Sequence, residues 1–476
     1  MNNKDGKVGI IIVLTIIILV ALGAWFLAIS KHFGLLELPT AEPTPAGDQS
    51  PAPDNPTPPA GGVAGTDDPT GSTDPEDPTD PTGHEDPDDP NAGDPHTGPD
   101  GDISTPRVLD ITQLSISSEY SAINAALDAI AKDYKCAAVS LVVYDGAKKE
   151  YYTYEYGNAN IEARQRVTSQ TKFRIASLSK LVTAICALTL VDDGFIDLDT
   201  DISNYFGYEV KNPHFPDTPV TTRMLMQHTS SIFDSGAFLV SRDNNSTESV
   251  RYLIERGSSF RRNKPGSLFE YSNFGYAVLG ALCERVSGKS LDTFAKEVLF
   301  DPLGIDAAFV PKNLNNTDNI AVMYDDRHNV TQSIIAQLAV TQTDTPGHDL
   351  HLAHANLTIS ALDYAKILSM IGNNGELDGV RILPSNLVNE MHKTNVKGFS
   401  YDQGLATRYS VGDFLPREGF YWHTGSSFGL FSQYDYKISP NRGVVVVTTG
   451  ASITRLSSGK IDVCNDLAKA AWKVFG

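Results

Sequence analysis

The distribution of apolar residues divides the chain into three unequal parts. Residues 8–30 form an apolar run without a charge, which at about 1.5 Å per residue is long enough to cross a bilayer as a helix. Residues 31–106 have no sustained apolar pattern and are rich in Pro, Asp and Thr. From residue 107 to residue 476, apolar runs with helical or strand spacing return, and this part is long enough to bury a large core.

The C-terminal part is predicted to have strands at both ends. Helical spacing of apolar residues predicts a helix over 117–132, followed by a strand over 137–144 and, after an Asp-Gly turn, a hairpin partner over 150–156. Two or three more strands are predicted within 421–450, the last apolar on both faces and therefore central, before an amphipathic helix over 461–475. The middle is mostly helical, so we expect one antiparallel sheet built from both ends around a helical insertion.

The first apolar run is predicted to anchor the chain in a membrane. Residues 1–7 carry two lysines and only Lys31 follows the run closely, so we expect a cytoplasmic tail over 1–7 and a transmembrane signal anchor over 8–30. The alternative is a signal peptide cleaved after Ala28-Ile29-Ser30, but the run is long for one. In the anchored form the protein is a single-pass cell-membrane protein whose remaining residues are extracytoplasmic.

The second part, residues 31–106, is predicted to be a disordered linker. It contains 17 Asp and Glu residues and, from residue 33 onward, no Lys or Arg, so it accounts for most of the net charge of −20. Repeated Asp-Pro and Pro-Thr pairs cannot form a core. We interpret this part as a passive, self-repelling stalk, with an acidic calcium- or wall-binding segment as the alternative, and the net charge therefore says little about the substrate.

The four cysteines lie far apart in the sequence. Cys186 and Cys283 fall in apolar helical runs and are predicted to be buried free thiols. Whether Cys136 pairs with Cys464 is left open by the sequence. Because no Cys-x-x-Cys is present, neither a zinc knuckle nor a thioredoxin-type site is indicated.

The first cluster of side chains that could carry out catalysis is Ser177-Leu178-Ser179-Lys180, which precedes an apolar helical run. If Ser177 begins the helix, the i,i+3 spacing places its hydroxyl and the Lys180 amine on one face. An amine whose pKa is lowered by burial or by nearby positive charge can take the hydroxyl proton. The free N–H groups of a first helical turn also favour a developing anion. On this motif alone, Ser177 and Ser179 are equal candidates for a nucleophile.

A second cluster contains Tyr271 and Asn273, just before a predicted helix over 275–286. In an extended segment these two side chains face the same side. A tyrosine beside a cation can ionise below its usual pKa of about 10 and shuttle protons, and an Asn side chain can both donate to and accept from an amide substrate. The alternative is a helix entry with a buried Tyr and an Asn cap.

A third cluster, over 421–429, opens the C-terminal strands and contains His423, Thr424 and Gly425. A glycine here would let a substrate backbone approach the strand closely. His423 is a candidate to bind a substrate carboxylate or to tune its neighbours' charge. The alternative is an ordinary edge strand with a glycine bulge.

In their order, these clusters resemble the serine β-lactamase and penicillin-binding protein superfamily, in particular its class C-like branch. The family pattern is Ser-x-x-Lys, then Tyr-x-Asn, then Lys- or His-Thr/Ser-Gly. Here these motifs are Ser177 to Lys180, Tyr271 to Asn273 and His423 to Gly425. The resemblance covers about residues 120–476, and its flanking segments are 224–231, 265–280 and 356–365.

The resemblance implies a three-layer α/β (α+β) fold, with an antiparallel sheet of five or more strands flanked by helices and a mostly helical inserted subdomain. It implies that Ser177 forms an acyl-enzyme, that Lys180 and Tyr271 share the proton transfers, and that Asn273 orients Lys180 and the substrate amide. Backbone N–H groups of Ser177 and Ser426 would form the oxyanion hole. No metal ion or cofactor is implied.

The resemblance also implies that the strand with His423, Thr424 and Gly425 orients the substrate. A Lys at position 423 would carry a full positive charge toward a substrate carboxylate, whereas His is mostly neutral at pH 7. In the family, His at this place accompanies esterases and aminopeptidases, so efficient β-lactam hydrolysis is not expected. Arg408 is a candidate replacement for the carboxylate anchor. Ser231 stands where the family usually has Gly.

Other candidate sites are rejected. Three aspartates mimic a calcium loop, but Ile202 and Tyr208 stand where that loop needs Gly and Glu. His228 is interpreted as structural, and no basic aromatic patch suggests nucleic acid. A group of three histidines is interpreted as a polar surface loop rather than a metal site. These two groups are Asp197, Asp199 and Asp201, and His348, His351 and His354.

The sequence therefore predicts a membrane-anchored, extracytoplasmic serine hydrolase of the cell envelope. Its expected substrates are small molecules or peptidoglycan-type peptides, as for a DD-carboxypeptidase, a D-aminopeptidase or an esterase, with β-lactams as further candidates. The alternative is a non-hydrolytic envelope protein that keeps the fold for binding or sensing.

Overall fold

The computed structural model describes residues 118–243, 250–343, 345–398, 400–411, 419–456 and 458–475. The segments predicted as cytoplasmic tail, membrane anchor and linker, residues 1–7, 8–30 and 31–106, lie outside these ranges. None of the helices in the described ranges combines the length and the apolar character needed to cross a membrane.

The largest element is a nine-stranded sheet in which all neighbouring strands are antiparallel. Its spatial order is β10-β11-β12-β13-β14-β15-β1-β2-β3, so strands from both ends of the described chain meet at β15 and β1. This confirms the predicted antiparallel sheet built from both ends. The strands are β1 (Ala138–Asp145), β2 (Glu150–Asn160), β3 (Gln165–Arg166), β10 (Val396–Lys397), β11 (Asp402–Gln403), β12 (Arg408–Val411), β13 (Gly419–Ser427), β14 (Leu430–Lys437) and β15 (Arg442–Thr449).

Strand β15 is central, as its apolar sequence predicted. It pairs with β14 on one side and β1 on the other, with Val445 opposite Val142. Successive valines point to opposite faces, and both faces are covered: Val444 packs in one apolar cluster and Val445 in the other. A strand buried on both faces has no room for polar residues in its middle, which explains its run of four valines.

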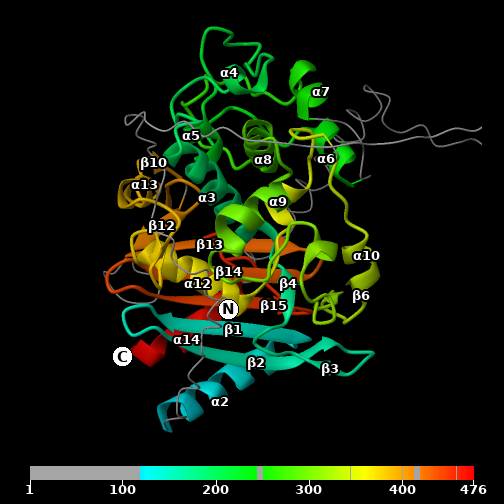
Figure 1. The fold of residues 1–476 in the computed structure, drawn as a ribbon. Coiled ribbons are helices and arrows are strands. Elements are labelled where there is room, and N and C mark those ends of the chain that lie inside the picture. Colours follow the sequence, from blue (N-terminus) through cyan, green and yellow to red (C-terminus); the bar gives the residue numbers. More distant parts are fainter. Residues whose placement is uncertain are drawn as a thin grey trace, which may run out of the picture. The chain divides into compact units, whose positions relative to one another are not determined.

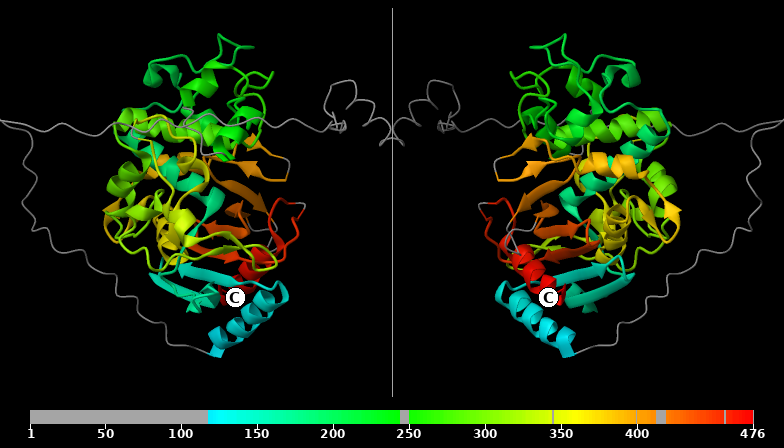
Figure 2. Two further views of the ribbon diagram at one scale, coloured as in Figure 1. Left: turned by 90° about the vertical axis from the view of Figure 1, so that its right-hand side faces the viewer. Right: turned by 90° about the vertical axis from the view of Figure 1, so that its left-hand side faces the viewer.

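Helices cover the sheet on both faces and complete three layers (Figures 1 and 2). Helices α2 (Ser118–Asp133) and α14 (Asp462–Trp472) pack on the outer face, where Leu127 and Leu467 join the outer apolar cluster. The predicted helices over 117–132 and 461–475 are therefore confirmed. On the inner face α12 (Ala361–Gly372) packs on β15 and β1, and α3 (Ser179–Asp192) packs against α8 (Asn273–Ser287) within the inner apolar cluster.

The middle of the chain is mostly helical, as expected, and its first helices, from α4 (Ser203–Phe206) to α7 (Val250–Glu255), lie above α3 and α12 in Figure 1. Its short strands form three two-stranded pairs, β4 with β7, β5 with β6 and β8 with β9. The helices are α4 (Ser203–Phe206), α5 (Thr222–Met226), α6 (Gly236–Asp243), α7 (Val250–Glu255), α9 (Leu291–Ala295), α10 (Ile334–Leu338), α11 (Leu352–Ala355) and α13 (Ser385–Met391). The paired strands are β4 (Lys172–Arg174), β5 (Met323–Tyr324), β6 (Val330–Gln332), β7 (Thr358–Ser360), β8 (Glu376–Leu377) and β9 (Val380–Arg381). The short helical turns are η1 (Ala176–Leu178), η2 (Lys296–Phe300), η3 (Pro311–Asn313) and η4 (Lys473–Phe475).

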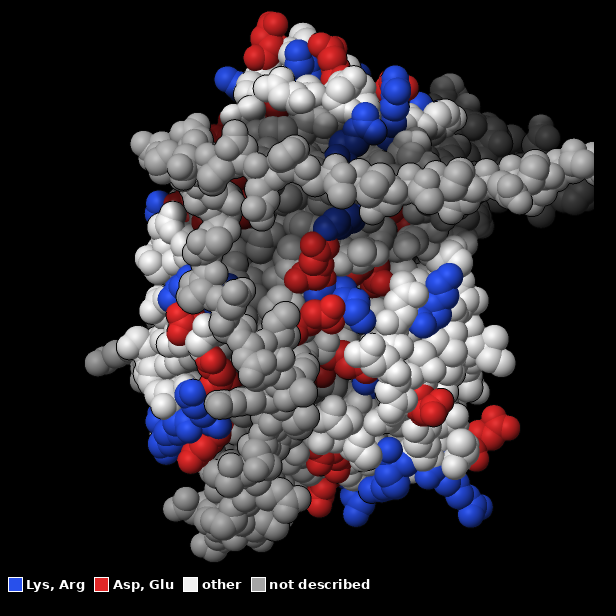
Figure 3. Space-filling view, in the orientation of Figure 1, with Lys and Arg blue, Asp and Glu red and all other residues white. Residues whose placement is uncertain are grey.

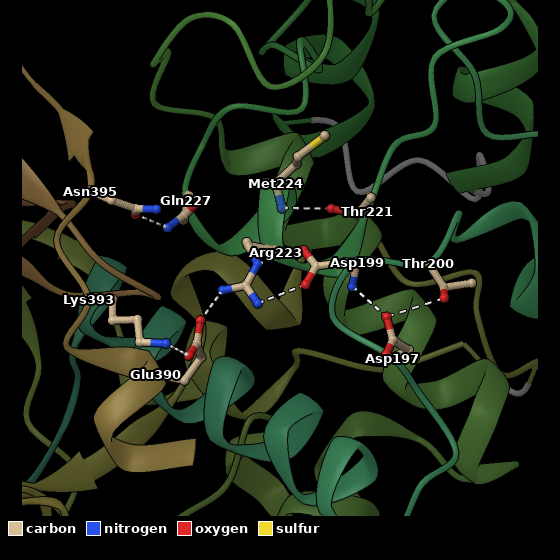
Figure 4. A network of polar contacts seen from close by, with 10 residues as sticks. All are labelled: Asp197, Asp199, Thr200, Thr221, Arg223, Met224, Gln227, Glu390, Lys393 and Asn395. Carbon is tan, nitrogen blue, oxygen red and sulfur yellow. Dashed lines mark hydrogen bonds and ion pairs between the residues drawn. The ribbon is translucent and has the colours of Figure 1, made fainter. Parts of the chain in front are cut away.

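Two of the aspartates that mimic a calcium loop, Asp197 and Asp199, have partners within the chain (Figure 4). Asp199 accepts hydrogen bonds from Nε and Nη2 of Arg223 at 2.7 and 2.9 Å, and Arg223 Nη1 donates to Glu390 of α13 at 2.5 Å. Asp197 Oδ1 accepts from the backbone N–H of Asp199 at 2.8 Å. The described ranges contain no cluster of three His, Cys, Asp or Glu side chains suited to a metal ion. The contacts of Arg223 with Asp199 and Glu390 join the 197–201 loop to α13.

All four cysteines are buried free thiols. This confirms the prediction for Cys186 and Cys283, which lie in α3 and α8. It also resolves the question left open by the sequence, because Cys136 and Cys464 are not joined.

Glu284, near the end of α8, is a buried carboxyl group that joins two loops. Its Oε1 accepts from the backbone N–H of Leu291 at 2.9 Å, and its Oε2 accepts from the backbone N–H of Gly347 at 2.8 Å. Burial raises the pKa of Glu284 to about 7 although these N–H donors oppose the rise. The segment after Gly347 leads into α11, which borders the cavity described below.

The raised pKa of Glu284 predicts a specific pH dependence of stability. Between its ordinary pKa of 4.5 and about 7, the folded carboxyl group stays protonated while the unfolded one ionises, so its contribution to stability is present at low pH and lost as the pH rises. The stability of the native chain relative to Glu284→Gln is expected to increase by about 3 kcal/mol from pH 8 to pH 4.5. Denaturant unfolding of both proteins across this range measures the difference, and a pH-independent difference would contradict the prediction.

Candidate active site

Ser177 lies on the turn η1, which enters α3. The i,i+3 argument assumed that Ser177 begins the helix, whereas α3 begins at Ser179, two residues later. Ala176 has a φ of 53°, a left-handed conformation that costs a non-glycine residue roughly 1–2 kcal/mol. Ser179 Oγ donates to the Ala176 carbonyl at 2.6 Å and accepts from the Leu357 N–H at 3.0 Å, which holds this turn in place. Ser179 is thus a structural residue, and Ser177 is left to face the cavity.

Lys180 is the centre of the site and is only 1% exposed. Its Nζ lies 3.2 Å from Ser177 Oγ, 2.9 Å from Asn273 Oδ1 and 2.7 Å from the His354 carbonyl oxygen. Burial lowers the pKa of Lys180 well below its usual value, against the charge of Asp234 and with the help of Arg408. A neutral amine has two N–H groups and one lone pair. In the neutral form of Lys180, the two carbonyl oxygens, which can only accept, take both N–H groups, and this leaves the lone pair for the Ser177 hydroxyl.

Tyr271 and Asn273 both reach this centre, as predicted. The Tyr271 ring centroid lies 4.9 Å from Lys180 Nζ. Burial raises the pKa of Tyr271 to about 12 although Arg408 and a hydrogen bond with Ser177 lower it, so the expected ionisation below 10 is wrong. Asn273 is the first residue of α8 rather than part of an extended segment, and the helix cap is Ser272, whose Oγ accepts from the Gly275 N–H at 2.8 Å.

Strand β13 places His423 away from the substrate side, contrary to the sequence expectation. The residue is 2% exposed, and its ring lies between those of Tyr271 and Tyr434 at centroid distances of 6.1 and 6.4 Å. Burial, Arg408 and Lys180 together lower the pKa of His423 well below its usual value, so it is neutral. The His423 ring therefore packs against the Tyr271 ring and does not line the cavity.

Gly425 makes room for the chain's own backbone, not for a substrate backbone as the sequence suggested. A Cβ at this position would lie 2.5 Å from the Ile175 carbonyl oxygen, 3.2 Å from Ala176 Cβ and 2.3 Å from Ser432 Oγ. The absence of a side chain lets β13 pass directly over the turn that carries Ser177.

A cavity of about 980 Å³ opens beside Ser177. None of the described residues lining it is Asp or Glu, whereas on the described surface in Figure 3 both charges are interspersed. A cavity with such a lining suits an anionic substrate. It is lined by Arg174, Ser177, Tyr271, Asn273, Val340, Thr341, His351, His354, Ala355, Asn356, Ser400, Tyr401, Arg408, Thr424, Ser426, Ser427, Phe428, Arg455, Ser458 and Gly459.

Arg408 of β12 is a cavity-lining cation that is only 8% exposed. Its guanidinium carbon lies 4.5, 5.2 and 5.4 Å from the ring centroids of Tyr401, Trp422 and Tyr271. Its Nε has no hydrogen-bond partner, and no ion pair to Arg408 occurs in the described residues. A buried charge held only by aromatic rings can take an anionic partner without first breaking an ion pair.

Two histidines outside the predicted site support it. His228 Nδ1 accepts from the Ser272 N–H at 3.1 Å, and its ring stacks 4.4 Å from that of Tyr271, in agreement with a structural role. His354 was interpreted as part of a polar surface loop, which is wrong: it is 4% exposed in α11, and its carbonyl binds Lys180. Sequence patterns cannot reveal this contact because it uses a backbone atom.

Asp234 is the site residue that the sequence analysis missed. It lies between α5 and α6, and its carboxylate accepts hydrogen bonds from Asn273 and from two neighbours at the start of α8. Its position just after the segment 224–231, which resembles a family motif, is the only sequence signal that pointed toward it.

The fold and the Ser–Lys–Tyr cluster define a β-lactamase-like protein. A family model described as Beta-lactamase matches residues 123–458, more than half of the sequence, and the chain belongs to this family.

The chain is also similar to individual curated relatives. Penicillin-binding protein 4 of Amycolatopsis lactamdurans is 26% identical over 303 residues, which cover 60% of this chain and 74% of the relative. Protein flp of Staphylococcus aureus (strain MRSA252) is 26% identical over 188 residues, 39% of this chain and 37% of the relative. Penicillin-binding protein 4* of Bacillus subtilis (strain 168) is 30% identical over 159 residues, 32% of this chain and 34% of the relative. The matches to the last two therefore span little more than a third of each relative.

Solved structures share the fold. A class C β-lactamase from Rhodobacter sphaeroides superposes with a TM-score of 0.59 at 19% identity, over 75% of this chain and 100% of its own. A D-amino acid amidase from Ochrobactrum anthropi SV3 gives a TM-score of 0.59 at 21% identity, over 75% of this chain and 99% of its own. At these identities the likeness shows the fold alone, and both proteins are hydrolases by name.

The close passage of β13 over the nucleophile turn predicts the effect of Gly425→Ala. The added Cβ forces β13 and the Ile175–Ser177 backbone apart, and a misplacement of about 1 Å lowers reaction rates by about 100-fold. We expect the rate at which an activated ester labels Ser177 to fall by that order. Gly379→Ala, where a Cβ would meet no atom within 4 Å although φ is 86°, is the control for a glycine substitution. Equal acylation rates in the two variants would contradict the prediction.

Proposed function

We propose that this chain is a serine hydrolase that forms an acyl-enzyme on Ser177. The observation that carries the proposal is the position of the buried Lys180 amine, 3.2 Å from Ser177 Oγ with two carbonyl oxygens holding its N–H groups. This arrangement supplies an internal base for a hydroxyl nucleophile. It also gives a reason for keeping a lysine in the core, where an unneeded charge would be costly.

The chemistry proceeds in two stages. Ser177 Oγ bonds to the substrate carbonyl carbon as its proton passes to Lys180 Nζ, and the oxyanion binds the backbone N–H groups of Ser177 and Ser426. The bond to the leaving amine or alkoxide then breaks, and the leaving group receives the proton through the neutral Tyr271 hydroxyl. Water attacks the acyl-enzyme with the same groups acting in reverse. Asn273 orients Lys180 and offers its amide to the substrate.

The proposed substrates carry a carboxylate next to the scissile bond: cell-wall-type peptides, D-amino-acid amides or esters, and β-lactams as weaker substrates. Support comes from Arg408, which lines the cavity and has no ion pair in the described residues, and from Thr424, which also lines the cavity. The names of the relatives, penicillin-binding proteins and a D-amino acid amidase, agree with this class. His423, which is neutral and buried, takes no part in charge recognition.

The proposed location is the outer side of a cell membrane. The uncharged apolar run over 8–30 anchors the chain, and the acidic linker over 31–106 carries the catalytic domain, residues 107–476, away from the bilayer. A long spacer suits a substrate that is itself an extended polymer outside the membrane.

The acyl-enzyme is tested with two covalent probes. The full-length chain is treated with a fluorescent fluorophosphonate and a fluorescent penicillin, and we expect the adduct on the peptide that contains Ser177. Ser177→Ala should remove labelling, and Ser287→Ala, at the last residue of α8, should keep it. If neither probe labels the wild-type chain and an activated ester is not hydrolysed, the hydrolase proposal is wrong, and non-covalent penicillin binding would then favour a sensing role.

Carboxylate recognition by Arg408 is tested with matched substrates. Loss of a charged hydrogen bond lowers binding by about 1.5–3 kcal/mol, so Arg408→Gln should reduce kcat/KM for a D-Ala-D-Ala-type depsipeptide by about 10- to 100-fold. The C-terminal carboxamide of the same depsipeptide is the control and should be little affected. An equal loss for both substrates would assign Arg408 to structure instead of recognition.

A further inference from the structure

Asp234 accepts three hydrogen bonds from the residues that open α8. Its Oδ2 accepts from Asn273 Nδ2 at 2.7 Å, and its Oδ1 accepts from the Phe274 N–H at 2.9 Å and from Ser272 Oγ at 3.3 Å. An ionised carboxylate has no N–H or O–H of its own, so every contact it makes here must be with a donor. Asp234 is half-buried and therefore holds this geometry without leaving water entirely.

This carboxylate determines which end of the Asn273 amide faces Lys180. With Nδ2 on Asp234, Oδ1 points to Lys180 Nζ at 2.9 Å. In the flipped amide, Oδ1 would meet the carboxylate and Nδ2 would meet the amine. The flipped Nδ2 would then donate to the lone pair of neutral Lys180. That lone pair would no longer be available to the Ser177 hydroxyl. The His354 carbonyl is a backbone group and cannot flip, so Asn273 is the adjustable contact of Lys180.

We propose that Asp234 is a positioning residue of this active site, which fixes the Asn273 amide so that the Lys180 lone pair is reserved for the Ser177 hydroxyl. The proposal rests on the proposed hydrolase function but concerns a residue outside the motif set. It also leaves the second N–H of Asn273 Nδ2 for a substrate carbonyl.

The charges around Lys180 give the proposal a measurable signature. Asp234 raises the pKa of Lys180 and Arg408 lowers it, both against the larger effect of burial. The other titratable groups near the amine are Tyr271 and Tyr276, whose ring centroids lie 4.9 and 5.5 Å from Nζ, and the buried His228, His423 and His354. His228 and His423 are neutral, since burial holds the pKa of each well below its usual value. Asp234 and Arg408 are therefore the two charged side chains that shift the pKa of Lys180, one upward and one downward.

The test variant is Asp234→Asn. An amide has one acceptor oxygen, so it cannot serve both the Phe274 N–H and Asn273 Nδ2, and its own NH2 group favours the flipped Asn273. General base catalysis contributes roughly 100- to 10,000-fold, and we expect this variant to lose at least about tenfold of the acylation rate constant with an uncharged ester. The lost negative charge should also move the acidic limb of the pH–rate profile to lower pH.

Asp199→Asn is the matched control, because it removes one carboxylate that pairs with Arg223 far from Lys180 in the hydrogen-bond network. We expect its acylation rate and acidic limb to match the wild-type chain. If Asp234→Asn shows the same unchanged limb and rate as this control, the proposal is wrong. A loss of thermal stability with an unmoved acidic limb would likewise overturn it and leave Asp234 as a helix-capping residue.

A second readout separates this proposal from the proposed function. The Lys180 side chain is titrated by ¹³Cε NMR in the full-length chain, with its signal identified by its absence in Lys180→Arg. A lower Lys180 pKa in Asp234→Asn than in Asp199→Asn supports the coupling even if no probe acylates the wild-type chain, in which case only the hydrolase proposal fails. An identical Lys180 pKa in the two variants contradicts the role of Asp234 whether or not the chain is a hydrolase.

Discussion

The amine of Lys180 lies where water cannot stabilise a charge, and the rest of the site is arranged around that constraint. Burial favours the neutral amine. The orientation of a neutral amine matters, because its two N–H groups need acceptors whereas its lone pair needs a donor. Helices α8 and α11 each bring one carbonyl acceptor, Asn273 Oδ1 and the His354 backbone oxygen. What remains of the hydrogen-bonding capacity of Lys180 is directed at Ser177. The core thus favours a neutral amine whose N–H groups have fixed partners.

The sheet contributes the opposite wall of the site. Strand β13 passes so closely over the Ile175–Ala176 backbone that only glycine fits at position 425. Its next residues, Ser426 and Ser427, line the cavity beside Ser177. Arg408 reaches the same cavity from β12 and is held by aromatic rings. The helices therefore hold the Lys180 amine, whereas the sheet provides one wall of the cavity and the positive charge of Arg408.

The parts of this arrangement that depend on local sequence were predictable. Ser177 and Lys180 are three residues apart, within one helical turn. The uninterrupted run of valines in β15 indicates a strand that is buried on both faces. The parts that depend on long-range packing were not. Which face of β13 carries His423 is set by its register with β14, and the space above Gly425 is filled by a segment some 250 residues earlier.

Electrostatic relationships were equally hidden in the sequence. The ionisation expected for Tyr271 fails because its burial outweighs the nearby cation, and burial is a property of the whole fold. Asp234 meets Asn273 only after the 228–235 loop folds against the start of α8. Residues 8–30 and 31–106 lie outside the described ranges, so anchor and linker stay predictions.

The central pairing of β1 with β15 has a consequence for how the chain reaches this structure. Asp145 and Arg442 stand opposite each other and are joined by an ion pair, although 297 positions separate them in sequence. A ribosome must therefore synthesise the whole stretch between β1 and β15 before β1 can pair with β15. Such non-local pairing slows folding and leaves strand edges open in the meantime. The nascent chain thus carries an incomplete sheet until β15 has been synthesised, and a deletion of β15 would remove the middle of the sheet.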